Sequence, residues 1–290
     1  MNNVFGTKYP IICAAMNTVS DIDLAIASAK AGILPSLIFN NYKSFVQIHE
    51  DLSKFKSEIG NCNLLFSYLK NELNANAITF FKILNEFKVP YIECSEKLIN
   101  NPMALKIIKQ YDIKLIVKDN NYPYFTDFCA DSLYAVNIKR DKGAGLSLGD
   151  QTFPSFREAI ADCKAKYPHL KIIASGGISS SLDIKELISD GADAVAIGTM
   201  FAFSKECKIS NVTKERIVNG NYQLTNNIKG RPQNAIIFEL DNEVDDRNNT
   251  NSLIKGVEGR GGHLFVGQGI HKITAIRTVN EIVTDLVECL

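Results

Sequence analysis

The sequence predicts an α/β protein whose strands and helices alternate to form one (β/α)₈ barrel, the TIM-barrel fold. Three observations lead to this prediction. Short runs rich in Ile, Val, Leu and Phe alternate with helical stretches through residue 203, there are eight such runs, and no linker interrupts them. A chain of 290 residues, of which 46% are hydrophobic, also has enough apolar surface for the large core of this fold.

The eight candidate strands are short runs rich in apolar residues. They comprise residues 10–14, 33–39, 63–68, 91–94, 113–118, 132–138, 171–175 and 192–198. Parallel strands joined by helices all point the same way, so their carboxyl ends meet at one mouth of the barrel. We therefore expect the functional residues in the loops that follow the strands.

Helix-start signals separate the strands in the first half of the chain. Ser20 is expected to cap a helix over residues 21–30, with Asp23 at the third helical position. Asn101 and Pro102 have the residue types of an N-cap and a first-turn proline, which predicts a helix through MALKIIKQY.

Similar signals continue in the second half. Pro154 opens a helix in SFREAIADCKAKY, and Ser180 with Asp183 begins the helix LDIKELISDG, which Gly191 closes. Near the end of the chain, apolar residues at helical spacing predict a core helix that packs on the barrel. These residues are Ile276, Val279, Ile282, Val283 and Leu286.

The alternation weakens between residues 205 and 262. We therefore predict a barrel made of residues 1–204 plus 263–290, and a less regular insertion, 205–262, that carries the exposed acidic and Asn-rich loop DNEVDDRNNTN. The alternating acids of this loop resemble a calcium loop, but the sixth position is not Gly and Ser252 occupies the place of the bidentate Glu. We expect no metal there.

Composition excludes several classes of partner. Thirty-two basic and thirty-two acidic residues leave no net charge, which argues against nucleic acid. The sequence contains no apolar run of membrane-spanning length and no leader-like start. Seven cysteines without a CxxC pair and four histidines without paired spacing argue against a zinc site. We expect a cytoplasmic protein that acts on a small molecule, and oligomer formation stays open.

Two glycine turns predict a phosphate site. One candidate strand ends at Ser175, Gly176 and Gly177, and the next ends at Gly198 and Thr199. These are the seventh and eighth strands, whose loops commonly bind phosphate in this fold, and glycine lets free backbone N–H groups approach the anion. The alternative is a pair of ordinary tight turns.

The turn after the first strand is a second candidate site. Ala15 and Met16, with Ala14 before them, could press flat against a planar ring, while Asn17 could hydrogen-bond to its edge. This turn belongs to the same mouth as the glycine turns. A turn that only supports the first helix is the alternative.

Several segments together resemble one enzyme family. The segments are PIICAAMNTVSDIDLAIASAKAGI, ASGGI, GADAVAIGTMF, KERIVNGNYQLT and GHLFVGQGIHKITAIRTVNEIVTDLV. They resemble nitronate monooxygenases and the flavin-type enoyl-acyl-carrier-protein reductases. This resemblance implies a barrel that binds FMN, with the phosphate on the two glycine turns and the isoalloxazine against Ala15 and Met16. It also implies that Gln268, in the GQG turn, lies close to the flavin.

Lys118 ends the apolar strand IKLIV at the predicted mouth. A cation beside the pyrimidine edge of a flavin stabilises the anionic reduced ring, so we predict a catalytic role for Lys118 as well as cofactor binding. A solvated lysine at a strand end is the alternative.

One departure from the family affects the chemistry. After the sixth strand, nitronate monooxygenases carry a histidine that acts as a base, whereas this chain reads NIKRDKGAGLSLGD, with no histidine. Asp141 is a weak candidate base, because its basic neighbours Arg140 and Lys142 lower the pKa of a carboxyl group. We therefore expect NAD(P)H oxidation or reduction of an activated acceptor rather than oxidation of neutral nitroalkanes.

Two other functions stay open. The stretches AAMNTVSD and GVEGRGG resemble the IMP dehydrogenase and GMP reductase group, which needs a nucleophilic cysteine after the sixth strand; GAGLSLGD has Ser147 but no cysteine. A purine nucleotide enzyme without that thiol is one alternative. A flavin or phosphate-ligand binding protein without catalysis is the other.

Overall fold

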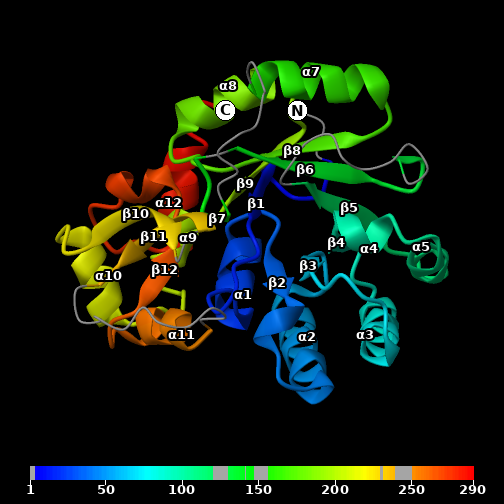
Figure 1. The fold of residues 1–290 in the computed structure, drawn as a ribbon, viewed down its shortest axis with the longest axis horizontal. Helices are drawn as coiled ribbons and strands as arrows, with labels where there is room; N and C mark the ends of the chain where they lie inside the picture. The colour runs from blue at the N-terminus through cyan, green and yellow to red at the C-terminus, as the bar shows by residue number, and fades with distance from the viewer. Residues whose placement is uncertain (1–3, 120–129, 141, 147–155, 229–230, 239–249) are drawn as a thin grey trace.

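We analysed a computed structural model of the 290-residue chain, which describes residues 4–119, 130–140, 142–146, 156–228, 231–238 and 250–290. Eight parallel strands form a nearly closed barrel with helices around it (Figure 1). The strands are β1 (Ile11–Cys13), β2 (Ser36–Ile38), β3 (Leu65–Tyr68), β4 (Tyr91–Ser95), β5 (Lys114–Asp119), β6 (Ala135–Lys139), β8 (Lys171–Ser175) and β9 (Ala194–Ile197). Each of them lies within or overlaps a predicted strand, so the (β/α)₈ fold class is confirmed.

The strand order shows how the barrel closes. Neighbouring strands follow the order β1-β9-β8-β6-β5-β4-β3-β2. The chain just before β2 completes the circle against β1, because the Cys13 N–H donates to the Leu34 carbonyl and the Leu34 N–H donates to the Ile11 carbonyl, each at 2.9 Å. The barrel is therefore a closed surface with one mouth at the carboxyl ends of its strands.

Helices in the barrel part of the chain surround these strands, and some of the short ones border the mouth. These helices are α1 (Ile22–Lys30), α2 (Phe45–Ile59), α3 (Ala75–Glu86), α4 (Glu96–Ile99), α5 (Pro102–Ile108), α7 (Phe156–Lys166), α8 (Ser181–Ser189), α9 (Thr199–Ala202) and α12 (Val279–Leu286), with the 3-10 turns η1 (Phe39–Asn41) and η2 (Gln268–Lys272). None of these helices is long and apolar enough to cross a membrane.

Alternate strand residues divide the core into two layers, because successive side chains of a strand point to opposite faces. The larger layer packs between strands and helices. The smaller one fills the barrel interior with residues such as Ile12, Ile116 and Ile173. At the amino-terminal end of the barrel, Phe5 is buried with its ring centroid 5.1 Å from that of Tyr91. The interior is therefore packed below the mouth.

The structure confirms two of the predicted helix starts, and a third, at Pro154, lies outside the described residues. Asn101 caps α5 with Pro102 in its first turn, Ser180 and Asp183 form a reciprocal capping box on α8, and Gly191 follows α8 with a φ of +106°. The predicted cap of α1 is wrong. Asp21, not Ser20, has the extended backbone of an N-cap and accepts from the Leu24 N–H at 3.0 Å.

The C-terminal helix is confirmed. Val279, Ile282, Val283 and Leu286 are buried on one face of α12, which packs against α1, α8 and α9. Ile276 is half-buried and precedes the helix. A capping box of Thr278 and Glu281 begins it.

Sequence analysis missed a second sheet beside the barrel. The described part of residues 205–262 contains α10 (Asn211–Val218), β10 (Gln223–Ile228), β11 (Arg231–Ile237) and α11 (Thr250–Glu258), where we expected less regular structure. β11 pairs with β10, with β12 (His263–Phe265) and with β7 (Gly145–Leu146), all antiparallel. β12 lies in the part of the chain that we assigned to the barrel. The division into domains stays a prediction, and residues 239–249 of the acidic loop lie outside the described residues.

Candidate active site

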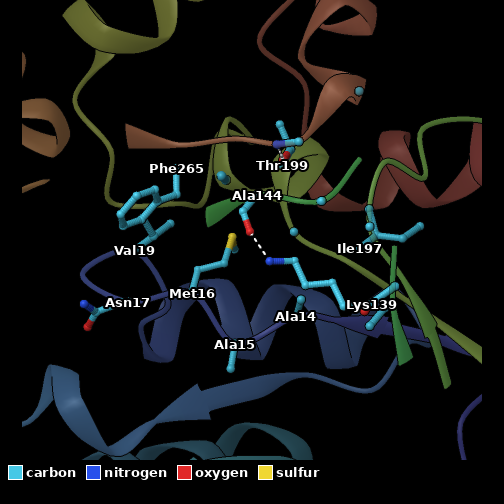
Figure 2. A pocket seen from close by; sticks show the side chains of 18 of the residues that line it. Ala14, Ala15, Met16, Asn17, Val19, Lys139, Ala144, Ile197, Thr199 and Phe265 are labelled. Atoms are coloured by element: carbon cyan, nitrogen blue, oxygen red, sulfur yellow. Dashed lines mark hydrogen bonds between the residues drawn. The ribbon is translucent and has the colours of Figure 1, made fainter. Parts of the chain in front are cut away.

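A cavity of about 250 Å³ opens at the carboxyl ends of the strands (Figure 2). Its walls come from the β1–α1 turn, the ends of β5 and β6, the loops after β6, β8 and β9, and the second sheet. The predicted site residues that line it are Ala15, Met16, Asn17, Lys118, Ser175, Gly176, Gly177, Gly198 and Thr199. Gln268 is exposed and does not line it, although its neighbours Gly267 and Gly269 do.

The loops after β8 and β9 offer backbone donors to this cavity. Among the described residues, none accepts a hydrogen bond from the N–H groups of Gly177, Ile178, Gly198 or Thr199, and all four residues line the cavity. At the start of α8, the Asp183 carboxylate already accepts from the Ser179 and Ser180 N–H groups. Anion binding here would depend on the loop amides.

The glycines after β8 also have a packing role. Gly176 and Gly177 have φ values of +99° and +68°. A Cβ at Gly177 would lie 2.6 Å from the Lys142 Cβ, and one at Gly176 would lie 2.8 Å from the Arg140 carbonyl oxygen. The tight-turn alternative therefore has a physical basis as well: the loop after β6 packs directly on the loop after β8.

Thr199 joins the β9 loop to the segment after β12. Its Oγ1 accepts from the Gly267 N–H at 2.9 Å, so its hydroxyl proton remains available for a ligand. The Gln268 N–H donates to the Lys142 carbonyl at 3.0 Å, which fixes the GQG turn through its backbone. That bond, and not the Gln268 side chain, connects this turn to the wall of the cavity.

The β1–α1 turn is held in shape from two sides. Ser20 Oγ accepts from the Met16 N–H at 2.9 Å, which explains why this serine does not cap α1. The Asn41 side chain accepts from the Thr18 N–H at 2.7 Å and donates to the Ser20 carbonyl at 2.8 Å. Thr18 has a φ of +63°, in a region that non-glycine residues seldom adopt. The turn that presents Ala15 and Met16 to the cavity is thus fixed by Asn41, which sequence analysis did not identify.

A buried polar cluster forms the floor of the cavity. The Glu93 carboxylate, 2% exposed, accepts from Ser67 Oγ at 2.9 Å, from Asn137 Nδ2 at 2.8 Å and from Lys118 Nζ at 3.4 Å. Because Asn137 directs its amide nitrogen to a carboxylate, its Oδ1 is the atom left over, and this buried oxygen has no partner in the part of the chain that the structure describes. Asn137 and Lys118 therefore offer an acceptor and a donor to a ligand.

Sequence analysis missed Glu93 and Asn137. Both are single polar residues inside apolar strands, in YIEC and AVNI. A polar residue that is buried costs free energy unless it is hydrogen-bonded, so its presence in a core strand is a usable signal. That signal would have identified both residues.

Lys139 is a further cationic residue of the wall. It is the last residue of β6, lines the cavity and donates from Nζ to the Ala144 carbonyl (Figure 2). Burial, and to a smaller extent the positive charge of Lys118, lowers the pKa of this amine to about 8. Sequence analysis did not identify Lys139 as a site residue.

None of the four histidines lines this cavity, and neither does any cysteine that the structure describes. His49 pairs with Glu86 on the surface, His169 bonds to the Ala130 carbonyl, and His271 is exposed. His263 is buried in β12, where its Nδ1 lies 2.8 Å from Ser252 Oγ. The weak base candidate Asp141 lies outside the described residues, as do Ser147 and Cys129.

Comparison with known proteins supports the family resemblance. Residues 149–288 match the family model for nitronate monooxygenase. A GMP reductase from Buchnera aphidicola subsp. Schizaphis graminum is 26% identical over 223 residues, and the match covers 68% of this chain and 58% of that enzyme.

Solved structures share the whole architecture. FabK from Thermotoga maritima superposes with a TM-score of 0.77 at 20% identity, covering 99% of this chain and 94% of FabK. A nitroalkane oxidase from Streptomyces ansochromogenes gives 0.71 at 16% identity, covering 97% and 95% of the two chains. The enoyl reductase domain of MlnA from Bacillus amyloliquefaciens gives 0.70 at 12% identity, covering 98% and 94%. At these identities the likeness establishes the fold.

Proposed function

Because the chain carries a segment of the nitronate monooxygenase family within the barrel that FabK and nitroalkane oxidase share, we propose that it is an FMN-dependent oxidoreductase of the nitronate monooxygenase and enoyl reductase type. The observation that supports this most directly is a set of backbone amides after β8 and β9 that have no acceptor among the described residues and that border one cavity with the β1–α1 turn. Amides directed at one space are typical of a phosphate site at the mouth of a barrel.

The residues of the cavity fit FMN. The amides of Gly177, Gly198 and Thr199 would hold its phosphate, and Ala15 with Met16 would contact its ring. When bound, FMN supplies reversible two-electron chemistry. The pyrimidine edge of a flavin carries an N–H group beside an acceptor. Asn137 Oδ1, which has no partner among the described residues, would accept from that N–H group, and the Lys118 ammonium would donate to the acceptor.

We infer that the chain reduces an activated acceptor, with NAD(P)H as the proposed electron donor, because no histidine lines its cavity. Oxidation of a neutral nitroalkane begins with loss of a carbon-bound proton, and general-base catalysis of such a step contributes roughly 10² to 10⁴ in rate. The histidine that the family uses for this step has no counterpart among the residues that line the cavity. A preformed nitronate anion needs no base and would also be accepted.

Flavin loading and turnover test this proposal. The purified protein, or the protein incubated with FMN, should show flavin absorption bands and bind about one FMN per chain. The loaded protein should oxidise NAD(P)H in the presence of an activated alkene or a nitronate, and do so faster than it consumes oxygen with the matched neutral nitroalkane. A protein that cannot be loaded with FMN would contradict the proposal, and a loaded protein without turnover would support the non-catalytic alternative.

Lys118→Met should lower the potential of bound flavin by roughly 30 mV, about 1.4 kcal/mol for a two-electron couple. The substitution removes a cation that stabilises the reduced ring and leaves the Glu93 carboxylate without its charge partner, and both effects act in the same direction. A dye-coupled titration measures the potential. Lys114→Met, at the opposite end of β5, is the matched control. Equal potentials in both variants would assign Lys118 a structural role only.

A purine nucleotide is the second candidate ligand, favoured by the match to GMP reductase. The same amides could bind a nucleotide phosphate, and the acceptor and donor pair of Asn137 and Lys118 also matches the lactam edge of a purine. The purine enzymes use a cysteine thiol, and none of the described cysteines lines this cavity. Calorimetry with IMP, GMP and FMN separates the two: tighter binding of a purine nucleotide would favour this alternative.

A further inference from the structure

The end of β6 contributes the amine of Lys139 to the wall of the cavity. Asn137 and Lys139 are two residues apart on β6, so their side chains leave the strand on the same face, and both line the cavity. Asn137 belongs to the floor, and Lys139 lies one step nearer the mouth. The amine therefore occupies the wall between the floor cluster and the glycine loops.

The loop after β6 holds this amine in place. The Lys139 Nζ donates to the Ala144 carbonyl, and a Cβ at Gly143 would lie 2.7 Å from the Lys139 Cε. Gly143 thus leaves room for the lysine stem against the loop. Figure 2 shows the side chain extending along the cavity toward Ala144. A flexible side chain is in this way confined to one place, as proton transfer requires.

Burial, and to a smaller extent the positive charge of Lys118, makes the proton of Lys139 acidic. In the part of the chain that the structure describes, Lys118 on β5 is the neighbour whose charge acts on it, and the Glu93 carboxylate on β4 bonds to Lys118, Asn137 and Ser67. Arg140 on the same loop directs its Nε to the Gly176 carbonyl, and Lys142 is exposed. With a pKa of about 8, the amine is about 90% protonated at pH 7 and releases its proton far more readily than an ordinary lysine.

We propose that Lys139 is the proton donor to the substrate in the reductive reaction, a role that rests on the proposed function. In the net reaction, a reduced nicotinamide transfers a hydride equivalent, with its two electrons, to an activated acceptor. One N–H bond of the Lys139 ammonium breaks, and its proton bonds to the acceptor atom that carries the added electron pair. The neutral amine then takes a proton from water, so that one NAD(P)H and one proton are consumed for each acceptor reduced.

Three variants separate proton donation from charge. Lys139→Arg keeps the positive charge but cannot release a proton, since a guanidinium stays protonated in proteins. We expect kcat to fall about 10²-fold to 10⁴-fold while FMN affinity stays within about threefold. Lys139→Ala should show the same loss, and added methylamine should restore part of kcat. Lys185→Arg, an exposed residue of α8, is the control and should behave as wild type.

The pH profile and an activity-independent titration complete the test. Wild-type kcat should be level below about pH 8 and fall above it, because the donor must be protonated, whereas the residual kcat of Lys139→Arg should lack this fall. In the protein without flavin, acetylation of Lys139 by a small anhydride, followed by mass spectrometry, should reach half its maximal rate near pH 8; exposed lysines provide the reference, at about 10.4.

The outcomes distinguish this inference from the proposed function. The donor role would be overturned if Lys139→Arg kept the wild-type kcat and pH profile. It would also be overturned if acetylation of Lys139 reached half its maximal rate near the pKa of an ordinary lysine, and either result would leave flavin binding intact. A wild-type protein that binds no FMN would overturn the proposed function and the donor role with it.

Discussion

Gly177→Val is expected to abolish retention of FMN, with affinity at least 100-fold weaker than in the wild type. Gly177 has a φ of +68°, which a β-branched residue tolerates poorly. Its first side-chain carbon would lie 2.6 Å from the Lys142 Cβ. The loop after β8 must therefore move, and the amide that we assign to the phosphate moves with it. Equilibrium dialysis with FMN, or fluorescence quenching of the free flavin, measures the effect.

Gly60→Val is the matched control for this variant. Gly60 also has a positive φ, +88°, but it ends α2, and apart from its chain neighbours no atom of the described residues lies within 4 Å of the position of its Cβ. It reproduces the backbone strain without the collision and away from the cavity. FMN should remain bound to this variant at wild-type affinity. If Gly177→Val retains flavin as well as Gly60→Val does, the phosphate binds elsewhere.

Glu93→Ala should lower the free energy of unfolding by about 3 kcal/mol, because removing one partner of a buried ion pair leaves the other uncompensated. Three groups lose their acceptor at once: the Lys118 ammonium, the Asn137 amide and the Ser67 hydroxyl. Chemical denaturation followed by circular dichroism measures this loss. The variant should also lose the orientation of Asn137, so its affinity for FMN should fall.

An exposed ion pair provides the comparison. Glu58 pairs with Lys30 at 2.8 Å on the surface, where water screens the charges and such pairs contribute little. Glu58→Ala should therefore leave the denaturation midpoint close to that of the wild type. An equally small effect of Glu93→Ala would mean that the floor cluster relaxes or hydrates without cost, and that it does not fix the two side chains that we assign to the ligand.

The barrel was predictable because its strands are continuous apolar runs. A parallel strand is buried on both faces, so β6 and β8 consist largely of apolar residues, and local sequence is enough to identify them. The second sheet gave no such signal. β10 reads QLTNNI, with four polar residues of six, and β7 has only two residues. These segments are strands because β11 pairs with them, and that pairing is not encoded locally.

The candidate site also contains residues that the sequence could predict and residues that it could not. The glycine turns and the β1–α1 turn could be proposed from the sequence because each is a contiguous motif, although Asn41, which holds the β1–α1 turn, lies outside that motif. Glu93 lies on β4, whereas Asn137 and Lys139 lie on β6, and these strands come close only through their pairing with β5. The lowered pKa of Lys139 could not be predicted from the sequence either, because burial in the folded structure causes it.

The contact between β7 and β11 has a consequence for the order in which the molecule is assembled. The loop after β6 pairs through Gly145 and Leu146 with residues almost ninety positions later, and Asn234 Nδ2 donates to the Gly143 carbonyl at 2.7 Å. A ribosome delivers the strands of the barrel well before this partner emerges. The barrel can therefore begin to close first, while the loop that holds the Lys139 amine acquires its support only after β11 has been synthesised. Ligand binding is in this way delayed until the last quarter of the chain has joined the fold.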